Sequence, residues 1–153
     1  MILNILQKLR QTDDNKASII LRISFFIMIF AHGAGKVLGI FGGLGFEKTM
    51  HHMTENMHIP YIFALIAIVV EFVSSLLLIL GYQTRINAFL LGIIMFVAST
   101  FHFKNGFYMN WFGQKAGEGF EFHILAIGMM LALVVLGGGK YSLDNTHKKK
   151  DLK

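Results

Sequence analysis

The segment from Ser18 to Gly45 constrains the fold most, because it joins a membrane-length apolar run to the basic side chains of Arg22, His32 and Lys36. An ionisable residue within a membrane span costs about 2.5 to 3.5 kcal/mol on insertion scales, so such residues usually face the interior of a helix bundle. At about 100° per residue, His32 and Lys36 lie about 80° and 40° from Arg22 around the helix. The segment therefore predicts one helix with a basic stripe turned towards its neighbours.

The composition places the chain among membrane proteins. Hydrophobic residues make up 54% of the 153 and charged residues only 15%, which is outside the usual range of soluble domains. The apolar runs reach the roughly 17 to 25 residues that cross about 30 Å of hydrocarbon. There is no cysteine, which excludes disulfides, thiolate metal sites and iron–sulfur clusters within this chain. Any redox role therefore needs a bound cofactor or a partner.

The apolar segments predict an all-α fold, a polytopic membrane four-helix bundle. We expect its spans at about residues 16–38, 60–80, 86–103 and 120–136. Residues 1–15 are predicted to form an amphipathic segment at the cytoplasmic interface, residues 16–140 the bundle, and residues 141–153 a basic cytoplasmic tail. The chain carries no dinucleotide fingerprint after a strand, no P-loop and no nucleophile elbow.

Basic residues flanking the spans predict the orientation. Nine lie on the side of the two termini, namely Lys8, Arg10, Lys16, Arg85, Lys140 and the lysines 148, 149, 150 and 153, against Lys36, Lys48, Lys104 and Lys115 on the other side. By the positive-inside rule, both termini lie in the cytoplasm, which suits a multi-pass protein of the inner (plasma) membrane. The tail charge indicates contact with anionic lipid, and not with nucleic acid.

Residues 46–60 form a separate feature, rich in methionine and histidine. Phe46, Met50, Met53 and Met57 recur at helical spacing, which predicts a short interfacial helix. Thioether and imidazole groups are also suitable ligands for Cu(I). Copper binding by residues 50–58 is therefore an open alternative.

The buried ionisable residues fall at different predicted depths. At about 1.5 Å per residue from the cytoplasmic helix ends, Arg22 lies about 6 Å deep, Glu71 about 14 Å and His32 about 21 Å. Arg22 is long enough to reach towards Glu71, so we expect these two to form a charge pair between the first two spans.

An upper layer lies near the outer face. Lys36, His102 and Glu121 are predicted at about 25 to 27 Å, close to the level of His32. We therefore expect a ligand pocket lined by His32, Lys36, His102 and Glu121, with Glu71 below them. His123, about 200° round the helix from Glu121, is predicted to face the membrane interface.

Several motifs occur in a characteristic order. They are LR followed by AHGAGK and FGGLGFE, Glu71 in the second span, LGYQTR after it, His102 with NGF, and EGFEF and GGGKYSLD on either side of the fourth span. With these motifs the chain resembles the DoxX family of four-helix membrane proteins over about residues 20–144. The resemblance points to Arg22, His32, Gly33, Lys36, Glu71, Arg85, His102 and Glu121. It implies a quinone-linked or oxidant-defence redox system.

The expected function is that of a membrane subunit of such a system, an oxidoreductase component not active alone. His32 or His102 would donate a hydrogen bond to a quinone carbonyl, and Glu71 or Glu121 would relay a proton. The expected partners are membrane lipid and a redox subunit, and self-association is left open. One alternative is a non-catalytic scaffold or small-solute carrier. Another is a haem or metal protein with His32 and His102 as axial ligands, although their predicted levels differ by about 6 Å and fit haem less well than quinone.

Overall fold

The computed structural model describes residues 11–146, and within that range all regular structure is helical. Most of the amphipathic segment expected at the N-terminus and the lysine-rich end of the chain lie outside the described residues.

Helix α2, Ala17–Leu38, is the predicted first span. Its first turn is held by Asn15, whose Oδ1 accepts hydrogen bonds from the backbone N–H and the hydroxyl of Ser18, at 3.0 and 2.9 Å. Gly39 ends it in the left-handed conformation (φ 71°), where its N–H reaches Gly35 O, because glycine adopts that conformation without strain. The buried face contains Arg22, whereas Ile27 on the opposite face is 67% exposed, as expected of a lipid-facing surface.

A short helical hairpin follows. Helix α3, Phe46–His51, continues into the π-helical turn η1, His52–Asn56, which confirms a helix in the Met- and His-rich segment. The second span consists of α4, Tyr61–Val69, the π-helical turn η2, Val70–Ser74, and α5, Ser75–Leu80. The π turn was not predicted from the sequence.

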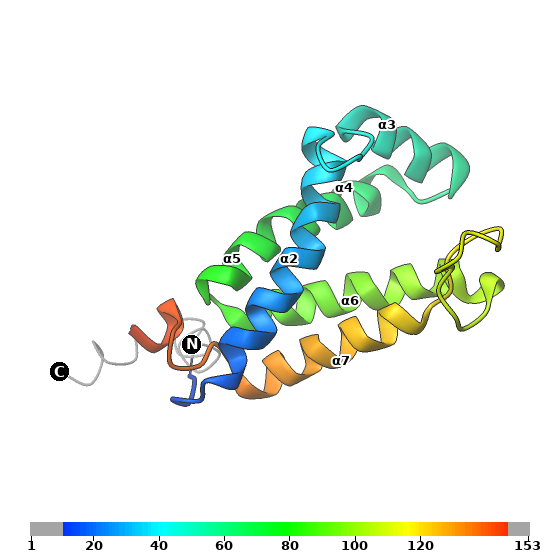
Figure 1. Cartoon of the computed structure of the whole chain (residues 1–153). Coiled ribbons are helices and arrows are strands. Elements are labelled where there is room, and N and C mark those ends of the chain that lie inside the picture. The colour runs from blue at the N-terminus through cyan, green and yellow to red at the C-terminus, as the bar shows by residue number, and fades with distance from the viewer. Residues whose placement is uncertain (1–10, 147–153) are drawn as a thin grey trace.

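The second half of the chain forms an antiparallel helix pair. Helix α6, Thr84–His102, runs into a 3₁₀ turn, η3, Phe103–Asn105, and α7, Glu121–Leu136, returns alongside it (Figure 1). The carboxylate of Asp144 caps the start of α6 by accepting from the N–H groups of Gln83 and Thr84 at 2.8 and 2.9 Å.

Within residues 11–146, three helical segments are long and apolar enough to cross a membrane, at residues 17–38, 61–80 and 84–105. Helix α7 is apolar but has 16 residues, which corresponds to about 24 Å. The described chain is thus a multi-pass membrane protein with three helices of spanning length. The fourth span and the cytoplasmic termini stay predictions.

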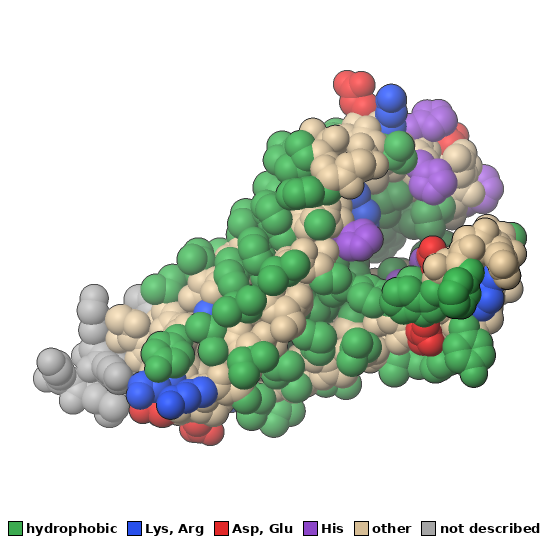
Figure 2. Space-filling model, in the orientation of Figure 1, with side chains coloured by type: hydrophobic (Ala, Val, Ile, Leu, Met, Phe, Trp, Pro, Cys, Tyr) green, Lys and Arg blue, Asp and Glu red, His purple; other side chains and the backbone are tan. Residues whose placement is uncertain are grey.

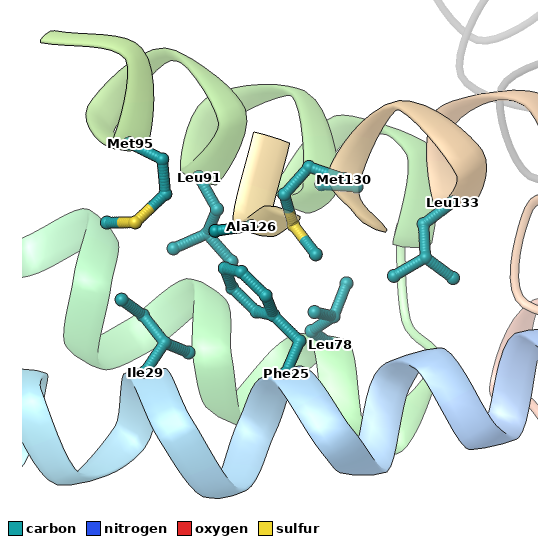
Figure 3. Close-up of a cluster of buried hydrophobic side chains, with 9 residues drawn as sticks. Phe25, Ile29, Leu78, Leu91, Met95, Ala126, Met130 and Leu133 are labelled. Carbon is teal, nitrogen blue, oxygen red and sulfur yellow. The ribbon is translucent and has the colours of Figure 1, made fainter. Parts of the chain in front are cut away.

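The helices form two arms that are joined at one end and diverge at the other. Helix α2 packs on α5 and η2, and α6 packs on α7 (Figure 1). The joined end is filled by a hydrophobic core to which α2, α5, α6 and α7 all contribute (Figure 3). Its buried members are Phe25, Ile29, Leu78, Ala88, Leu91, Met95, Ala126, Met130 and Leu133.

The joined end also includes residues 137–146. The N–H of Lys140 donates to Asn15 O at 2.9 Å, and Asn145 Nδ2 donates to Asp14 Oδ1 at 2.8 Å. Asp144 and Asn145 are 1% and 2% exposed. The folded part of the chain therefore continues past residue 140, where the tail was expected to begin.

Candidate functional site

A cavity of about 760 Å³ lies where the two arms diverge. Figure 2 shows the corresponding hollow, with histidine and Lys or Arg side chains at its edge. The walls are mostly apolar and come from α2, the glycine-rich loop after it, the hairpin, α4 and α6. Its polar and charged lining residues are His32, Lys36, Thr49, His52, Glu71 and His102. The structure thus brings His32, Lys36, Glu71 and His102 together, as the sequence predicts.

Lys36 and Glu71 form an ion pair in this cavity. Lys36 Nζ lies 2.6 Å from both Oε1 and Oε2 of Glu71. The Glu71 side chain is 4% exposed and that of Lys36 is 32% exposed. A carboxylate this deeply buried requires a partner charge, and Lys36 provides it from the neighbouring span.

The position of Glu71 depends on the π turn and on a glycine. Glu71 lies within η2, where the extra residue of a π turn shifts the direction of the following side chains; such turns are frequent at functional sites. A Cβ at position 33 would lie 3.0 Å from the backbone of Glu71 and Phe72. Gly33 therefore allows α2 to touch the π turn, and this contact places Lys36 within reach of Glu71.

His102 is oriented by the loop before α7. Its Nδ1 lies 3.0 Å from the carbonyl oxygen of Glu118. Because a carbonyl can only accept, we assign the proton of this bond to Nδ1. In the neutral ring Nε2 then carries the free lone pair. His102 can thus accept a hydrogen bond at Nε2 when neutral and donate one when protonated.

His123 was predicted to face the interface, and this is wrong. It is 8% exposed, and its ring centroid lies 4.8 Å from that of His102. Its Nδ1 is buried without a hydrogen-bond partner. The prediction assumed that Glu121 faces the bundle interior, which would turn His123, about 200° round the helix, outward. The loop before α7 instead binds the carboxylate of Glu121, and His123 is the residue that faces inward.

Glu121 does not line the cavity, contrary to prediction. Its Oε1 accepts from the N–H of Met109 and from Nε1 of Trp111, each at 3.0 Å. The carboxylate therefore organises the aromatic loop of residues 106–120. Its predicted depth was similar to that of His102, but α7 contributes no residue to the cavity wall.

The predicted pair of Arg22 and Glu71 is also wrong. Arg22 is 2% exposed, and its guanidinium donates to four backbone carbonyls. These are Leu78 O at 2.8 Å, Ile79 O at 2.6 Å, Gly138 O at 2.7 Å and Tyr141 O at 2.9 Å. The last carbonyls of a helix lack the usual partner four residues on, and Arg22 joins those of Leu78 and Ile79 to the C-terminal segment. Arg22 is therefore part of the joined end and not of the cavity.

The depth estimate failed for Lys36 for a simple reason. It compared Cα heights and placed Lys36 more than 10 Å above Glu71. A lysine side chain extends about 6 Å from its Cα and can lie along apolar surface, so the ammonium group need not lie at the height of its own Cα. The apolar lining was not predicted, although Ile93, Val97 and Phe101 recur at helical spacing before His102.

The described residues contain no group of three or more His, Asp or Glu side chains placed to hold a metal ion. His52, Met53 and Met57 line the cavity at the hairpin. Copper binding by residues 50–58 stays a prediction, because the methionine thioethers of this segment are themselves suitable ligands for Cu(I).

The family comparison covers the helices that form the cavity. The DoxX family model matches residues 17–104, which contain α2, the hairpin, the second span, α6 and every polar residue of the cavity. No curated protein and no solved structure gives a significant match. Since the matched segment covers more than half of the 153 residues, this chain belongs to the DoxX family.

Proposed function

We propose that this DoxX-family protein is the membrane subunit of a quinone-linked redox or oxidant-defence system, and that the cavity binds the quinone head group. The observation that carries the proposal is the convergence of His32, Lys36, Glu71 and His102 in one largely apolar cavity. Ligand sites of this kind combine apolar walls with a few polar groups that fix orientation.

The donors of the cavity suit a quinone head group. Its carbonyl oxygens only accept hydrogen bonds, so a matching site must supply donors. Lys36 has three N–H groups and directs only part of them to Glu71. His32 lies on the same face of α2 and His102 lies on α6. Because the Nδ1–H of His102 bonds to Glu118 O, His102 donates from Nε2 to the ligand only in its protonated form. Bound quinone would supply two-electron, two-proton redox chemistry, and the side chains of the cavity would hold and orient it.

Glu71 and His102 are the groups suited to hold a proton beside the ligand. General acid–base groups must lie within hydrogen-bond reach of the reacting oxygen. Glu71 lies at the inner wall, and His102 lies at the loop end. The chain has no cysteine for a thiol relay or an iron–sulfur cluster, so electrons must come from another bound cofactor or from the partner subunit that we propose. We place the complex in the plasma membrane, with both termini in the cytoplasm.

The test is quinone binding by the purified protein in nanodiscs. We expect menaquinone-4 or decylubiquinone to bind, and a quinone to be found by mass spectrometry of the co-purified small molecules. Lys36→Met should weaken binding, whereas Lys48→Met, at an exposed lysine outside the cavity, should not. Wild-type protein that binds neither quinone would instead favour a scaffold or small-solute carrier.

An absorption spectrum of the purified protein tests the alternative that the cavity binds haem. His32 and His102 both line the cavity, and opposed histidines are the ligands that a bis-histidine haem requires. We expect no Soret band from the purified protein. A Soret band that disappears in His102→Ala would replace the quinone proposal with a haem site.

A further inference from the structure

The apolar wall of the cavity reaches the outer surface of the molecule between α4 and α6. On these two helices, four apolar side chains line the cavity and are nevertheless exposed: Phe63 (62%) and Ile66 (47%) on α4, and Ile93 (43%) and Val97 (46%) on α6. Phe41 (69%) and Leu44 (58%), in the loop after α2, are exposed lining residues as well, so the cavity also opens beside that loop. A side chain that lines a closed cavity would be buried. The cavity is therefore open along the gap between these two helices.

The gap has a structural cause. Helix α6 packs against η2 and α5. Helix α4, on the other side of the π turn, packs against α2, α3 and η1. The second span thus follows α6 as far as residues 70–74 and then diverges from it (Figure 1). The π turn that holds Glu71 marks the inner end of the gap.

The gap opens onto a surface that faces lipid. Both of its edges belong to segments of spanning length, and its four edge residues carry no polar side-chain group. Among the polar groups of the cavity, Glu71 lies at the inner end of the gap, within the π turn, and its buried carboxylate is paired with Lys36. A ligand that fills the cavity and the gap together must have a polar head and a long apolar tail.

We propose that the gap between α4 and α6 is a lateral portal, through which the hydrocarbon tail of a membrane-dissolved quinone passes from the cavity into the bilayer. This inference rests on the proposed function and names its substrate class, tailed quinones that enter from the lipid. The tail contacts Phe63 and Ile66 on one edge and Ile93 and Val97 on the other. The portal therefore selects for the tail, independently of the head group.

The experiment compares a tailed quinone with its tail-free head in nanodiscs, menaquinone-4 with menadione. Affinities are expressed per mole fraction of quinone in the lipid phase. The different partitioning of the two quinones into lipid then does not contribute to the comparison of their affinities. We expect Val97→Trp, which narrows the portal, to weaken menaquinone-4 about tenfold and to change menadione less than about twofold. The matched control is Ile27→Trp, at a residue that is 67% exposed on α2 and outside the cavity, and it should change neither.

A photolabel carried on the quinone tail gives a second measurement that needs no substitution. We expect labelled peptides from residues 61–69 and 84–102, and none from the lipid-facing side of α2 at Ile20 and Ile27. Equal effects of Val97→Trp on the two quinones, or labelling of α2 as strong as that of α4, would overturn the portal while quinone binding by the wild type still supported the proposed function. Wild-type protein that binds neither menadione nor menaquinone-4 would overturn both.

Discussion

The ammonium group of Lys36 lies 2.6 Å from both carboxylate oxygens of Glu71, across the interface between the first two spans. The two partners differ in exposure, because the Glu71 side chain is 4% exposed and that of Lys36 is 32% exposed. Loss of Lys36 leaves a carboxylate in an apolar wall, whereas loss of Glu71 leaves an ammonium group that can turn outward.

We therefore expect Lys36→Met to destabilise the protein more than Glu71→Gln does. Removing one partner of a buried pair costs about 3 to 5 kcal/mol, and Lys36→Met should approach the lower end of this range. The double variant should be more stable than Lys36→Met alone. The free energy of unfolding, measured by SDS titration in detergent micelles, checks the order of the three variants.

The control for this comparison of single and double variants is a second pair, Arg22 and Glu71. Arg22 was predicted to pair with Glu71 and instead binds backbone carbonyls. Arg22→Met and Glu71→Gln should have additive effects, within about 0.5 kcal/mol, because the two residues share no partner. Strong coupling between Arg22 and Glu71, with additive effects of Lys36 and Glu71, would contradict the observed pairing.

A second prediction concerns the contact between Gly33 and the π turn. A Cβ at position 33 would lie 3.0 Å from the backbone of Glu71 and Phe72, and backbone atoms cannot move aside as a flexible side chain can. Overpacking of this kind typically costs about 1 to 3 kcal/mol. We expect Gly33→Ala to lower the free energy of unfolding and to weaken quinone binding, since α2 and Glu71 must separate.

Gly128 is the matched control, because it also lies inside a helix but a Cβ there would meet no atom within 4 Å. Gly128→Ala should be neutral or stabilise the protein by up to about 1 kcal/mol, the difference in helix propensity. Equal effects of the two substitutions would show that the contact at Gly33 does not position the π turn.

Sequence periodicity predicted four polar residues of the cavity, because polar residues are rare in the apolar helices and were expected to face one another. His32, Lys36, Glu71 and His102 interrupt apolar helices, and each was expected to face the interior. The number of residues between each of them and the cytoplasmic end of its helix gave its predicted depth. Which residues share a helix face could thus be predicted from the sequence, whereas the predicted separation of Lys36 and Glu71 was wrong.

The pairing of charges could not be predicted in the same way. The partners of Arg22 are main-chain carbonyls, which every residue has and no residue type reveals. The four carbonyls lie close enough together to bind one guanidinium group only because α5 ends beside the segment of residues 137–146. The π turn at Glu71 lies in close tertiary contact with Gly33, and no local pattern in the second span indicates that turn.

A third prediction concerns His123, whose Nδ1 is buried without a partner beside the ring of His102. An unsatisfied buried polar atom costs about 1 to 3 kcal/mol. His123→Phe keeps a flat ring and removes that atom, so the variant should be at least as stable as the wild type. Thermal unfolding in detergent measures this, and a fall in stability would show that Nδ1 has a partner, such as a buried water.

His102→Phe serves as the comparison, because His102 lines the cavity and bonds to Glu118 O. It should lose quinone affinity, whereas His123→Phe should keep most of it. Equal loss of affinity in the two variants would mean that the two rings act on the ligand as a unit.

The last prediction tests whether α7 crosses the membrane. Its 16 residues correspond to about 24 Å, somewhat short of the roughly 30 Å of hydrocarbon. If α7 spans, Lys115 in the loop before it and Lys140 after it lie on opposite sides of the membrane.

The chain has no cysteine, so the single-cysteine variants Lys115→Cys and Lys140→Cys each report on one position without background labelling. In intact cells, a membrane-impermeant maleimide should label Lys115→Cys and leave Lys140→Cys unmodified until the membrane is opened. Labelling of both from outside would leave three spans and place the C-terminal segment outside. Labelling of Lys140→Cys alone would keep α7 as a span but reverse the orientation expected from the basic residues.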